Sequence, residues 1–214
     1  MAKTKTNPQI TFRPAKPEDG KTAGRLLFDT FAKEAAFVVG LGSEERAKKI
    51  LAKLFSVSGH RLSYEFSEMI LLDGQVVGVI TSFPGKMIGK LNRSFAWLVM
   101  KQYRLRGKLA LVKRGFSDLF VKEAAKDEFH LAHLSVKPRY RGKGVGGKAL
   151  SHFVENAKLA GFTKVSLTVD IENKAASRLY ERHGYQTRAI NLIPKKLVPY
   201  LGSGSLRMVK NLDQ

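Results

Sequence analysis

Hydrophobic and polar residues follow two periods along the chain, one typical of β-strands and one typical of α-helices. Short runs rich in apolar and β-branched residues predict strands over 9–13, 68–72, 75–82, 129–136, 164–170, 187–192 and 205–209. Apolar residues three and four positions apart predict helices from Pro17 to about Val38, from Ser43 onward, over 144–160 and over 174–183. Together these elements predict an α/β fold.

Glycines mark the ends of several predicted elements. Asp73-Gly74 separates two strand-like runs and is typical of a two-residue hairpin turn. Gly161 and Gly184 follow the last apolar residues of the two late helices, where a left-handed backbone is favoured. We therefore expect a hairpin over 68–82 and well-defined ends for both late helices.

The segment between the strand at 129–136 and the helix at 144–160 is rich in glycine and basic residues. Its centre reads Arg141, Gly142, Lys143, Gly144, Val145, Gly146, Gly147. Glycine lets the backbone approach a ligand closely, and the first amides of a helix have no partner inside the helix. Five basic residues and no acidic residue lie from Lys137 to Lys148. This combination predicts a cradle for a pyrophosphate.

Three sequence motifs fit this glycine loop. Its glycines satisfy G-x-G-x-x-G, but a dinucleotide-binding fold places the first glycine directly after the strand, and here 137–141 intervene. The stretch 142–148 matches the start of G-x-x-x-x-G-K-[ST], but Ala149 replaces the hydroxyl residue that would hold magnesium. The third motif, R-x-x-G-x-G, is met by Arg141, Gly144 and Gly146.

A second motif follows at the next predicted strand and helix. The pattern N-x-x-A-x-x-L-Y-x-x-x-G-[FY] is met by Asn173, Ala176, Leu179, Tyr180, Gly184 and Tyr185. With R-x-x-G-x-G before it, the region from about His130 to Tyr185 resembles the GNAT superfamily of N-acetyltransferases. The resemblance implies the GNAT acyl-CoA N-acyltransferase fold, a mixed central β-sheet flanked by helices. It also implies transfer of an acetyl group from acetyl-CoA directly to a primary amine, without a metal.

The resemblance also implies how the donor is bound. In the family, the strand before the loop separates from its neighbour and its backbone pairs with the pantetheine arm, here at Leu134, Ser135 and Val136. The loop residues Arg141 to Gly147 would then hold the phosphates, mainly through backbone amides. Asn173 matches a residue that often bonds the pantetheine arm, although asparagine is equally suited to cap the helix that begins there.

Catalysis requires a base for the amine and a donor for the leaving thiolate. His130 matches the position of a glutamate base in several family members, and an imidazole suits the role. His133, or Asp127 or Glu128 acting through water, are alternatives. Regular strand alternation predicts that His130 and His133 point to opposite faces. Tyr180 matches the family's general acid, although packing in the core also explains it.

Composition limits the remaining possibilities. The chain has 214 residues, a net charge of +20 and no cysteine, which excludes disulfides and thiolate metal sites. We expect one N-acetyltransferase domain over 1–214 in the cytoplasm, because no stretch resembles a signal peptide or a membrane span. The charge favours anionic partners such as nucleic acid or a membrane surface. No motif identifies the acceptor amine. Edge strands in this fold often pair, so a homodimer is a further expectation.

The segment 85–127 is predicted to be a basic helical insertion between the third and fourth strands. Its apolar residues recur at helical spacing: Leu91, Phe95, Leu98, Leu105, Leu109, Val112, Phe116 and Leu119. We expect two helices packed over the sheet that form a wall of the acceptor pocket. A basic amphipathic surface could instead bind an anionic membrane or RNA. The alternative function is therefore a non-catalytic acetyl-CoA-binding protein attached to such a partner. A nucleotide hydrolase is a third and less favoured function.

Overall fold

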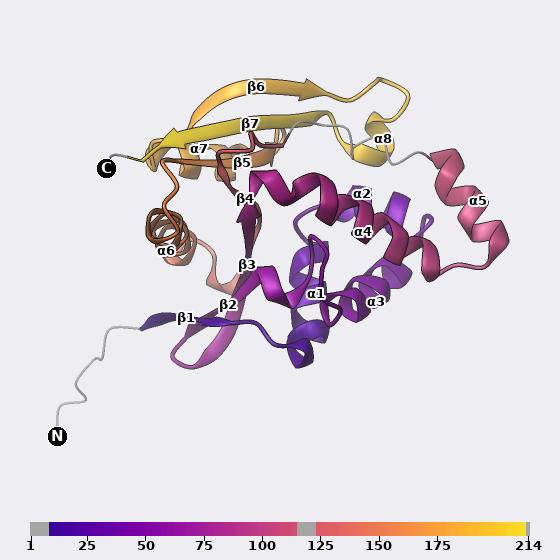
Figure 1. Ribbon diagram of the computed structural model, residues 1–214, viewed down its shortest axis with the longest axis horizontal. Coiled ribbons are helices and arrows are strands. Elements are labelled where there is room, and N and C mark those ends of the chain that lie inside the picture. The colour runs from indigo at the N-terminus through magenta and orange to yellow at the C-terminus, as the bar shows by residue number, and fades with distance from the viewer. Residues whose placement is uncertain (1–8, 115–122, 213–214) are drawn as a thin grey trace.

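A computed structural model shows one mixed β-sheet with helices on both faces (Figure 1). It describes residues 9–114 and 123–212. The strands are arranged in the order β1-β2-β3-β4-β5-β7-β6, and only β4 and β5 are parallel. Their bounds are β1 Ile10–Pro14, β2 Ser67–Leu72, β3 Gln75–Pro84, β4 Phe129–Val136, β5 Lys164–Asp170, β6 Gln186–Leu192 and β7 Gly204–Asn211. The predicted mixed sheet is confirmed.

The helices divide the core into two clusters, one on each face of the sheet. The helices of the first face are α1 Gly20–Phe28, α3 Glu44–Phe55, α4 Ile88–Lys101 and α5 Leu105–Arg114. The helices of the second face are α6 Val145–Leu159 and α7 Lys174–Arg182. A short α8 Val198–Leu201 precedes β7. None of the helices in the described ranges is long and apolar enough to cross a bilayer.

The predicted turns are confirmed, but the first predicted helix is interrupted. Asp73 and Gly74 have φ values of 50° and 77°, as a hairpin turn of this kind requires. The helix expected from Pro17 to about Val38 ends instead at Phe28, where the Thr30 hydroxyl donates to the Leu27 carbonyl. Such a side-chain bond competes with continued helix. A short α2 Ala32–Glu34 and the π-helical turn η2 Ala35–Val39 complete the segment.

Helices α4 and α5 occupy part of the segment 85–127, but the single apolar seam predicted along it is wrong. On α4, Leu91 and Phe95 are buried as predicted. On α5, Leu111 is buried, while the three seam residues are exposed: Leu105, Leu109 and Val112. The cause is the end of α4 at Gln102, after which α5 begins with a different rotational phase. Phe116 and Leu119 lie outside the described residues.

The sheet is divided between β4 and β5. These two strands pair only from Phe129 to Leu131, opposite Val165 to Leu167. From His133 to Val136, β4 continues to pair with β3 on its other edge. The two halves of the sheet therefore separate after Leu131, and the β5-facing edge of β4 is left without a strand. This confirms the separation that the family resemblance implied.

A bulge in β4 changes the face to which its side chains point. The register between β3 and β4 shifts so that His133 is opposite Thr81 while Leu131 is opposite Ser82, and Ala132 is passed over. A bulge places one extra residue in one strand and reverses the alternation beyond it.

The two histidines of β4 consequently point to the same face. His130 is opposite Phe83 and His133 is opposite Thr81, two residues away on β3. Cross-strand partners share a face, as do alternate residues of one strand. The prediction that regular alternation places His130 and His133 on opposite faces is therefore wrong, because it did not include the bulge.

The close packing of α1 on α3 gives a prediction about stability. A Cβ on Gly24 would lie 2.5 Å from the Ala52 backbone nitrogen, so the two helices touch at backbone distance. We expect Gly24→Ala to lower the free energy of unfolding by about 1–3 kcal/mol, because overpacking outweighs the better helix propensity of alanine. Urea denaturation measures the change.

Gly89→Ala is the matched control, because Gly89 lies on the exposed side of α4 with only the Arg93 guanidinium nearby. This substitution should leave stability unchanged or raise it by about 0.5 kcal/mol. Equal effects of the two substitutions would contradict the close helix contact.

Candidate functional site

The separation between β4 and β5 creates a polar backbone edge inside the sheet. After Leu131, β5 offers no hydrogen bonds to β4. Backbone N–H and C=O groups in such a position need other partners. An extended ligand with its own amide groups can supply them, as an added strand does at a sheet edge.

The glycine loop lies directly beyond this edge, at the start of α6. Gly142 and Gly144 have φ values of 73° and 78°, in the left-handed region that favours glycine. Gly144 is the N-cap of α6 and has no side chain to bond the first-turn amides. The first bond of the helix runs from the Lys148 amide to the Gly144 carbonyl, 3.1 Å apart. The first-turn amides and the positive helix end are therefore suited to an anion.

Neighbouring contacts hold the loop against β4 and α7. The Arg141 Nε donates to the Val136 carbonyl at 2.8 Å, which ties the loop to the end of β4. A Cβ on Gly146 would lie 3.3 Å from Leu179, and one on Gly147 would lie 3.3 Å from the His183 ring. These two glycines thus permit α7 to pack closely on the first turn of α6. The structure brings the predicted phosphate-binding residues together at one end of β4.

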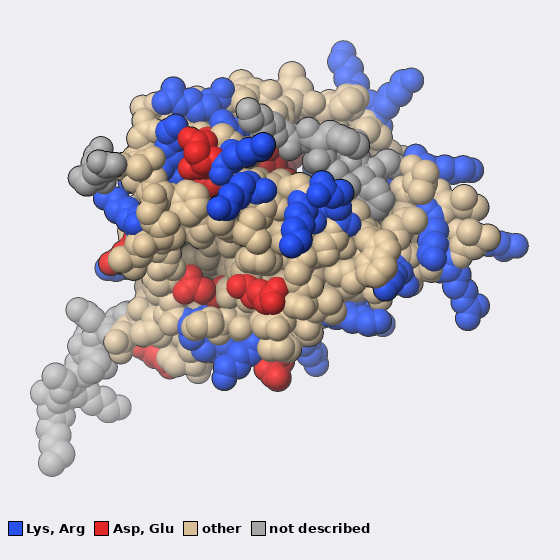
Figure 2. Space-filling view, viewed as in Figure 1, with Lys and Arg blue, Asp and Glu red and all other residues tan. Residues whose placement is uncertain are grey.

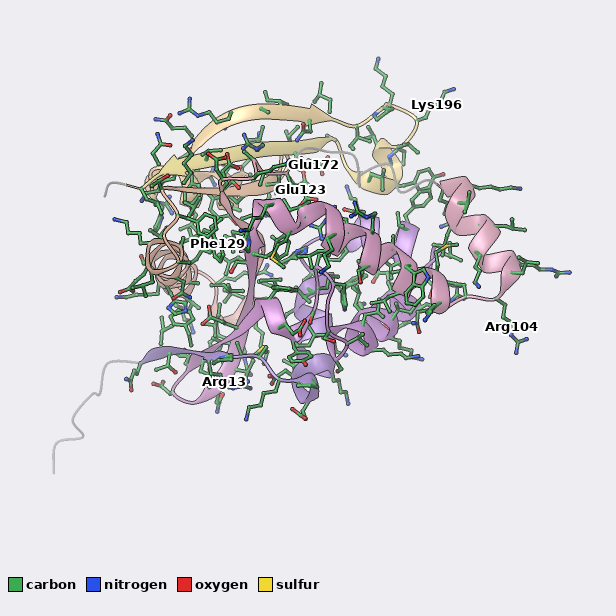
Figure 3. All side chains as sticks on the ribbon, in the orientation of Figure 1. Arg13, Arg104, Glu123, Phe129, Glu172 and Lys196 are labelled. Carbon is green, nitrogen blue, oxygen red and sulfur yellow. The ribbon has the colours of Figure 1, made fainter. Side chains whose placement is uncertain are left out.

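His130 is fully buried at the point where β4 and β5 still pair. Its Nδ1 is 3.1 Å from the hydroxyl of Ser166, its partner on β5. Its Nε2 is 3.4 Å from a carboxylate oxygen of Glu123. Figure 3 labels Glu123 near the start of β4, which Phe129 marks. The predicted base is thus placed between a hydroxyl and a carboxylate.

Glu123 is held by a buried arginine. Both carboxylate oxygens accept from the Arg61 guanidinium at 2.8 Å, and the side chains of the pair are only 10% and 15% exposed. Burial opposes ionisation of the carboxyl, but the positive charge of Arg61 and its two hydrogen bonds, with the nearby His130 ring, keep the pKa of Glu123 far below its usual range. A negative charge therefore remains beside His130.

His133 has a different environment on the same face. Its Nδ1 is 2.8 Å from the Thr30 hydroxyl, and its ring lies 5.1 Å from that of Phe31. Its Nε2 is buried with no hydrogen-bond partner among the described residues. Burial, and then the charge of Arg61, lowers the pKa of His133 to about 3. The imidazole is therefore neutral at pH 7.

The two acidic alternatives for the base have other partners. Asp127 is exposed and forms an ion pair with Lys164 at 2.9 Å. Glu128 is buried and accepts from Arg207, with one oxygen 2.6 Å from the guanidinium. Burial opposes ionisation of Glu128, but Arg207 outweighs it and lowers its pKa. Both carboxylates thus have structural ion pairs.

Tyr180 lies on the second face of the sheet, in the core cluster with α6. Its ring packs edge-on against Tyr185 at 6.0 Å, and the residue is 8% exposed. Burial raises the pKa of Tyr180 to about 12, so the phenol keeps its proton at neutral pH. Tyr185 is also buried, and its hydroxyl has no partner in the described part of the protein. The packing role of Tyr180 is therefore confirmed, and a protonated phenol is available.

Asn173 caps α7. Its side-chain oxygen accepts from the Ala176 amide at 3.1 Å, as an N-cap does. The amide nitrogen of its side chain is not used in this cap. A shallow cavity of about 270 Å³ lies between α6, the end of α7 and β7, lined by residues such as Val154, His183 and Lys210, and contains none of the predicted site residues. Within 9–114 and 123–212, no group of acidic, His or Cys side chains could hold a metal ion.

Three residues of this site were not predicted from the sequence. Glu123 and Ser166 contact His130, and Arg61 contacts Glu123, but the three are separated from His130 by 7, 36 and 69 positions. No local motif connects them, because the network depends on pairing between strands and on the path of the chain into β4.

These features define a class of protein, an α/β protein whose sheet opens beside a glycine loop suited to an anion. Comparison with known proteins gives the family. Residues 59–185 match the model of the Acetyltransferase (GNAT) family. The chain therefore belongs to the GNAT acetyltransferases, as the sequence motifs predicted.

Individual relatives are distant. The chain is 25% identical to the Probable N-acetyltransferase camello of Xenopus tropicalis over 84% of its own length and 77% of that protein. It is 34% identical to an uncharacterized N-acetyltransferase of Methanocaldococcus jannaschii over 36% of its own length, and this match spans only 29% of the relative. Its fold resembles an N-acetyltransferase from Staphylococcus aureus Mu50, with a TM-score of 0.70 at 22% identity over 93% and 99% of the two chains.

The environment of His133 predicts a pH dependence of stability. The unfolded chain takes up a proton at this residue below pH 6.5, whereas the folded protein does so only near pH 3. Acidification through this interval therefore favours unfolding, by up to about 1.4 kcal/mol per pH unit. We expect His133→Gln to remove that part of the slope when urea denaturation is measured at several pH values between the two pKa values. Parallel slopes for both proteins would contradict the neutral imidazole of the folded protein.

Proposed function

We propose that this protein transfers the acetyl group of acetyl-CoA directly to a primary amine of a small molecule or protein. The observation that carries the proposal is the unpaired edge of β4, which leads directly into the glycine loop of α6. Acetyl-CoA has amide groups in its pantetheine arm, which match the strand edge, followed by a pyrophosphate, which matches the glycine loop. Family membership supports the same donor.

The donor would lie along β4 with its thioester toward the start of the strand. The backbone groups of Leu134, Ser135 and Val136 would bond the pantetheine amides, and the side-chain amide nitrogen of Asn173 would assist. The backbone amides from Gly142 to Gly147 would hold the pyrophosphate, and the charges of Arg141 and Lys143 would add to the attraction. No metal is needed for this arrangement.

The acceptor must lose a proton before it attacks. An ammonium with a pKa near 10 is only about one part in a thousand neutral at pH 7, which costs about 4 kcal/mol. We assign the base to His130. Ionised Glu123 favours the tautomer with a proton on Nε2, so Nδ1 accepts from Ser166. His130 and Ser166 are both fully buried. The amine proton would pass to the Ser166 oxygen as Ser166 gives its own proton to Nδ1, with the Glu123 carboxylate beside the protonated ring.

Tyr180 would protonate the leaving thiolate. Its raised pKa keeps the proton on the phenol until a stronger base forms nearby. Tyr180 belongs to the α6 side of the sheet and His130 to the α1 side, so the two groups would act on the thioester and the amine from opposite faces of β4. His133 stays the alternative base, because its free Nε2 lies on the same face as His130. We propose a cytoplasmic location for the reaction.

Ligand binding tests the donor. We expect acetyl-CoA to raise the melting temperature by roughly 5–10 °C at about 100 times its Kd, because selective binding at that level adds about 2.7 kcal/mol. Magnesium-ATP and NAD are the comparison ligands. Thioester hydrolysis that depends on an added amine would then show catalysis, whereas binding without amine-dependent turnover would identify a non-catalytic acetyl-CoA-binding protein. A shift with magnesium-ATP or NAD alone would contradict the proposal.

Substitutions test the proton path. We expect His130→Ala and Ser166→Ala to lower kcat by about 10²- to 10⁴-fold, the usual contribution of a positioned base. Tyr180→Phe preserves the ring packing and should lower kcat while leaving the acetyl-CoA-induced melting shift intact. A Tyr180→Phe protein with full turnover would exclude the phenol as the acid. If His130→Ala and Ser166→Ala keep full activity and His133→Gln loses it, the base is His133.

A further inference from the structure

The outer side of α5 carries an apolar stripe that the described residues, 9–114 and 123–212, leave exposed. Leu105, Leu109 and Val112 are 72%, 55% and 64% exposed. Single exposed apolar residues are ordinary, but these three follow one another at i, i+4 and i+7. At 100° per residue they fall within an arc of about 60° on the helix. The three side chains therefore form one continuous stripe.

The opposite side of α5 is fixed to the protein. Leu111 is fully buried, and the Arg114 guanidinium donates to the Phe37 carbonyl at 2.6 Å and lies over the Phe37 ring. Gly107 packs against Tyr103, where a Cβ would lie 2.7 Å from its ring. Because these contacts define the inner face, the stripe must point away from the body. Figure 1 shows α5 projecting at the edge of the molecule.

Basic side chains border the stripe on both sides. Lys108 lies about 40° beyond Val112 around the helix, and Lys113 lies about 40° beyond Leu109 on the other side. Both lysines are exposed. Residues 86–114 contain nine lysines and arginines and no acidic residue. Figure 2 shows basic side chains around this end of the molecule, and Figure 3 shows Arg104 directed outward beside α5.

We infer that α5 is a peripheral docking surface for an anionic lipid bilayer. Aliphatic residues flanked by lysines match the boundary between acyl chains and negatively charged headgroups. Nucleic acid would satisfy the lysines but would leave the aliphatic stripe without a partner, so the combination favours lipid. The helix has 10 residues, which suits a position in the plane of the surface and is far too short to span a bilayer. This inference does not depend on the proposed acetyl transfer.

Vesicle pelleting with the whole protein tests the surface. We expect binding to vesicles of phosphatidylcholine mixed with phosphatidylglycerol, and weak binding to phosphatidylcholine alone, at physiological ionic strength. The triple substitution of Leu105, Leu109 and Val112 by serine should weaken binding about tenfold or more. The double substitution of Lys108 and Lys113 by glutamine should weaken it roughly 10- to 30-fold.

Matched controls separate this surface from the charge of the whole protein. Lys16 and Lys21 are exposed outside α5, and their replacement by glutamine removes the same charge. Leu159 and Ile190 are 83% and 62% exposed elsewhere, and their replacement by serine removes similar apolar surface. The controls should bind within about twofold of the unmodified protein. Thermal unfolding must show that every variant is folded.

Several results would overturn the inference. Equal loss of binding in the control and α5 variants would show attraction by net charge only. Unchanged vesicle binding after the leucine and valine substitutions would exclude the stripe. Binding to single-stranded RNA but not to vesicles would assign the basic surface to nucleic acid. A concentration-dependent dimer in sedimentation equilibrium that the serine substitutions abolish would assign the stripe to a second copy of the chain.

Discussion

The separation of β4 from β5 is the constraint on which the rest of the site depends. Two parallel strands that remained paired to Val136 would satisfy the whole backbone of β4 and leave nothing for a ligand. Here pairing ends at Leu131, while β3 supports the other edge of β4 to its end. The strand is therefore rigid on one side and open on the other. A binding site formed by backbone groups needs this support. A mobile strand would have to become ordered each time it bound a donor, and the lost conformational entropy would weaken binding.

The bulge at Ala132 determines which side chains of β4 lie beside this opening. It reverses the side-chain alternation one residue beyond the paired segment, so His130 and His133 lie on the face that also carries Thr30 and Glu123. Without the extra residue, one imidazole would enter the cluster with α6. Bulges occur next to active sites because they redirect a side chain without moving the strand. In this protein the redirected residue is His133.

The residues explain why some features were predictable and others were not. The glycine loop and the motif around Tyr180 are local, since their geometry depends on backbone freedom and helical spacing that short sequences specify. The face of His133 depends on pairing with β3, and the position of Glu123 depends on Arg61 far away in the chain. The predicted orientation of α5 was wrong for a third reason. The chain is interrupted after Gln102, so α5 begins with a different rotational phase, and hydrophobic periodicity does not specify the phase across an interruption.

The Arg61–Glu123 pair is better explained by position than by stability. Burying two charges costs several kcal/mol for each ion, and even a bidentate pair often does no more than offset this cost. The pair does connect the segment between α3 and β2 to the residues that enter β4, and Arg207 also donates to the Glu123 carbonyl. Removing either partner would leave an uncompensated charge in the core. The network therefore selects one position for Glu123, and that position is the one that places a permanent negative charge 3.4 Å from His130.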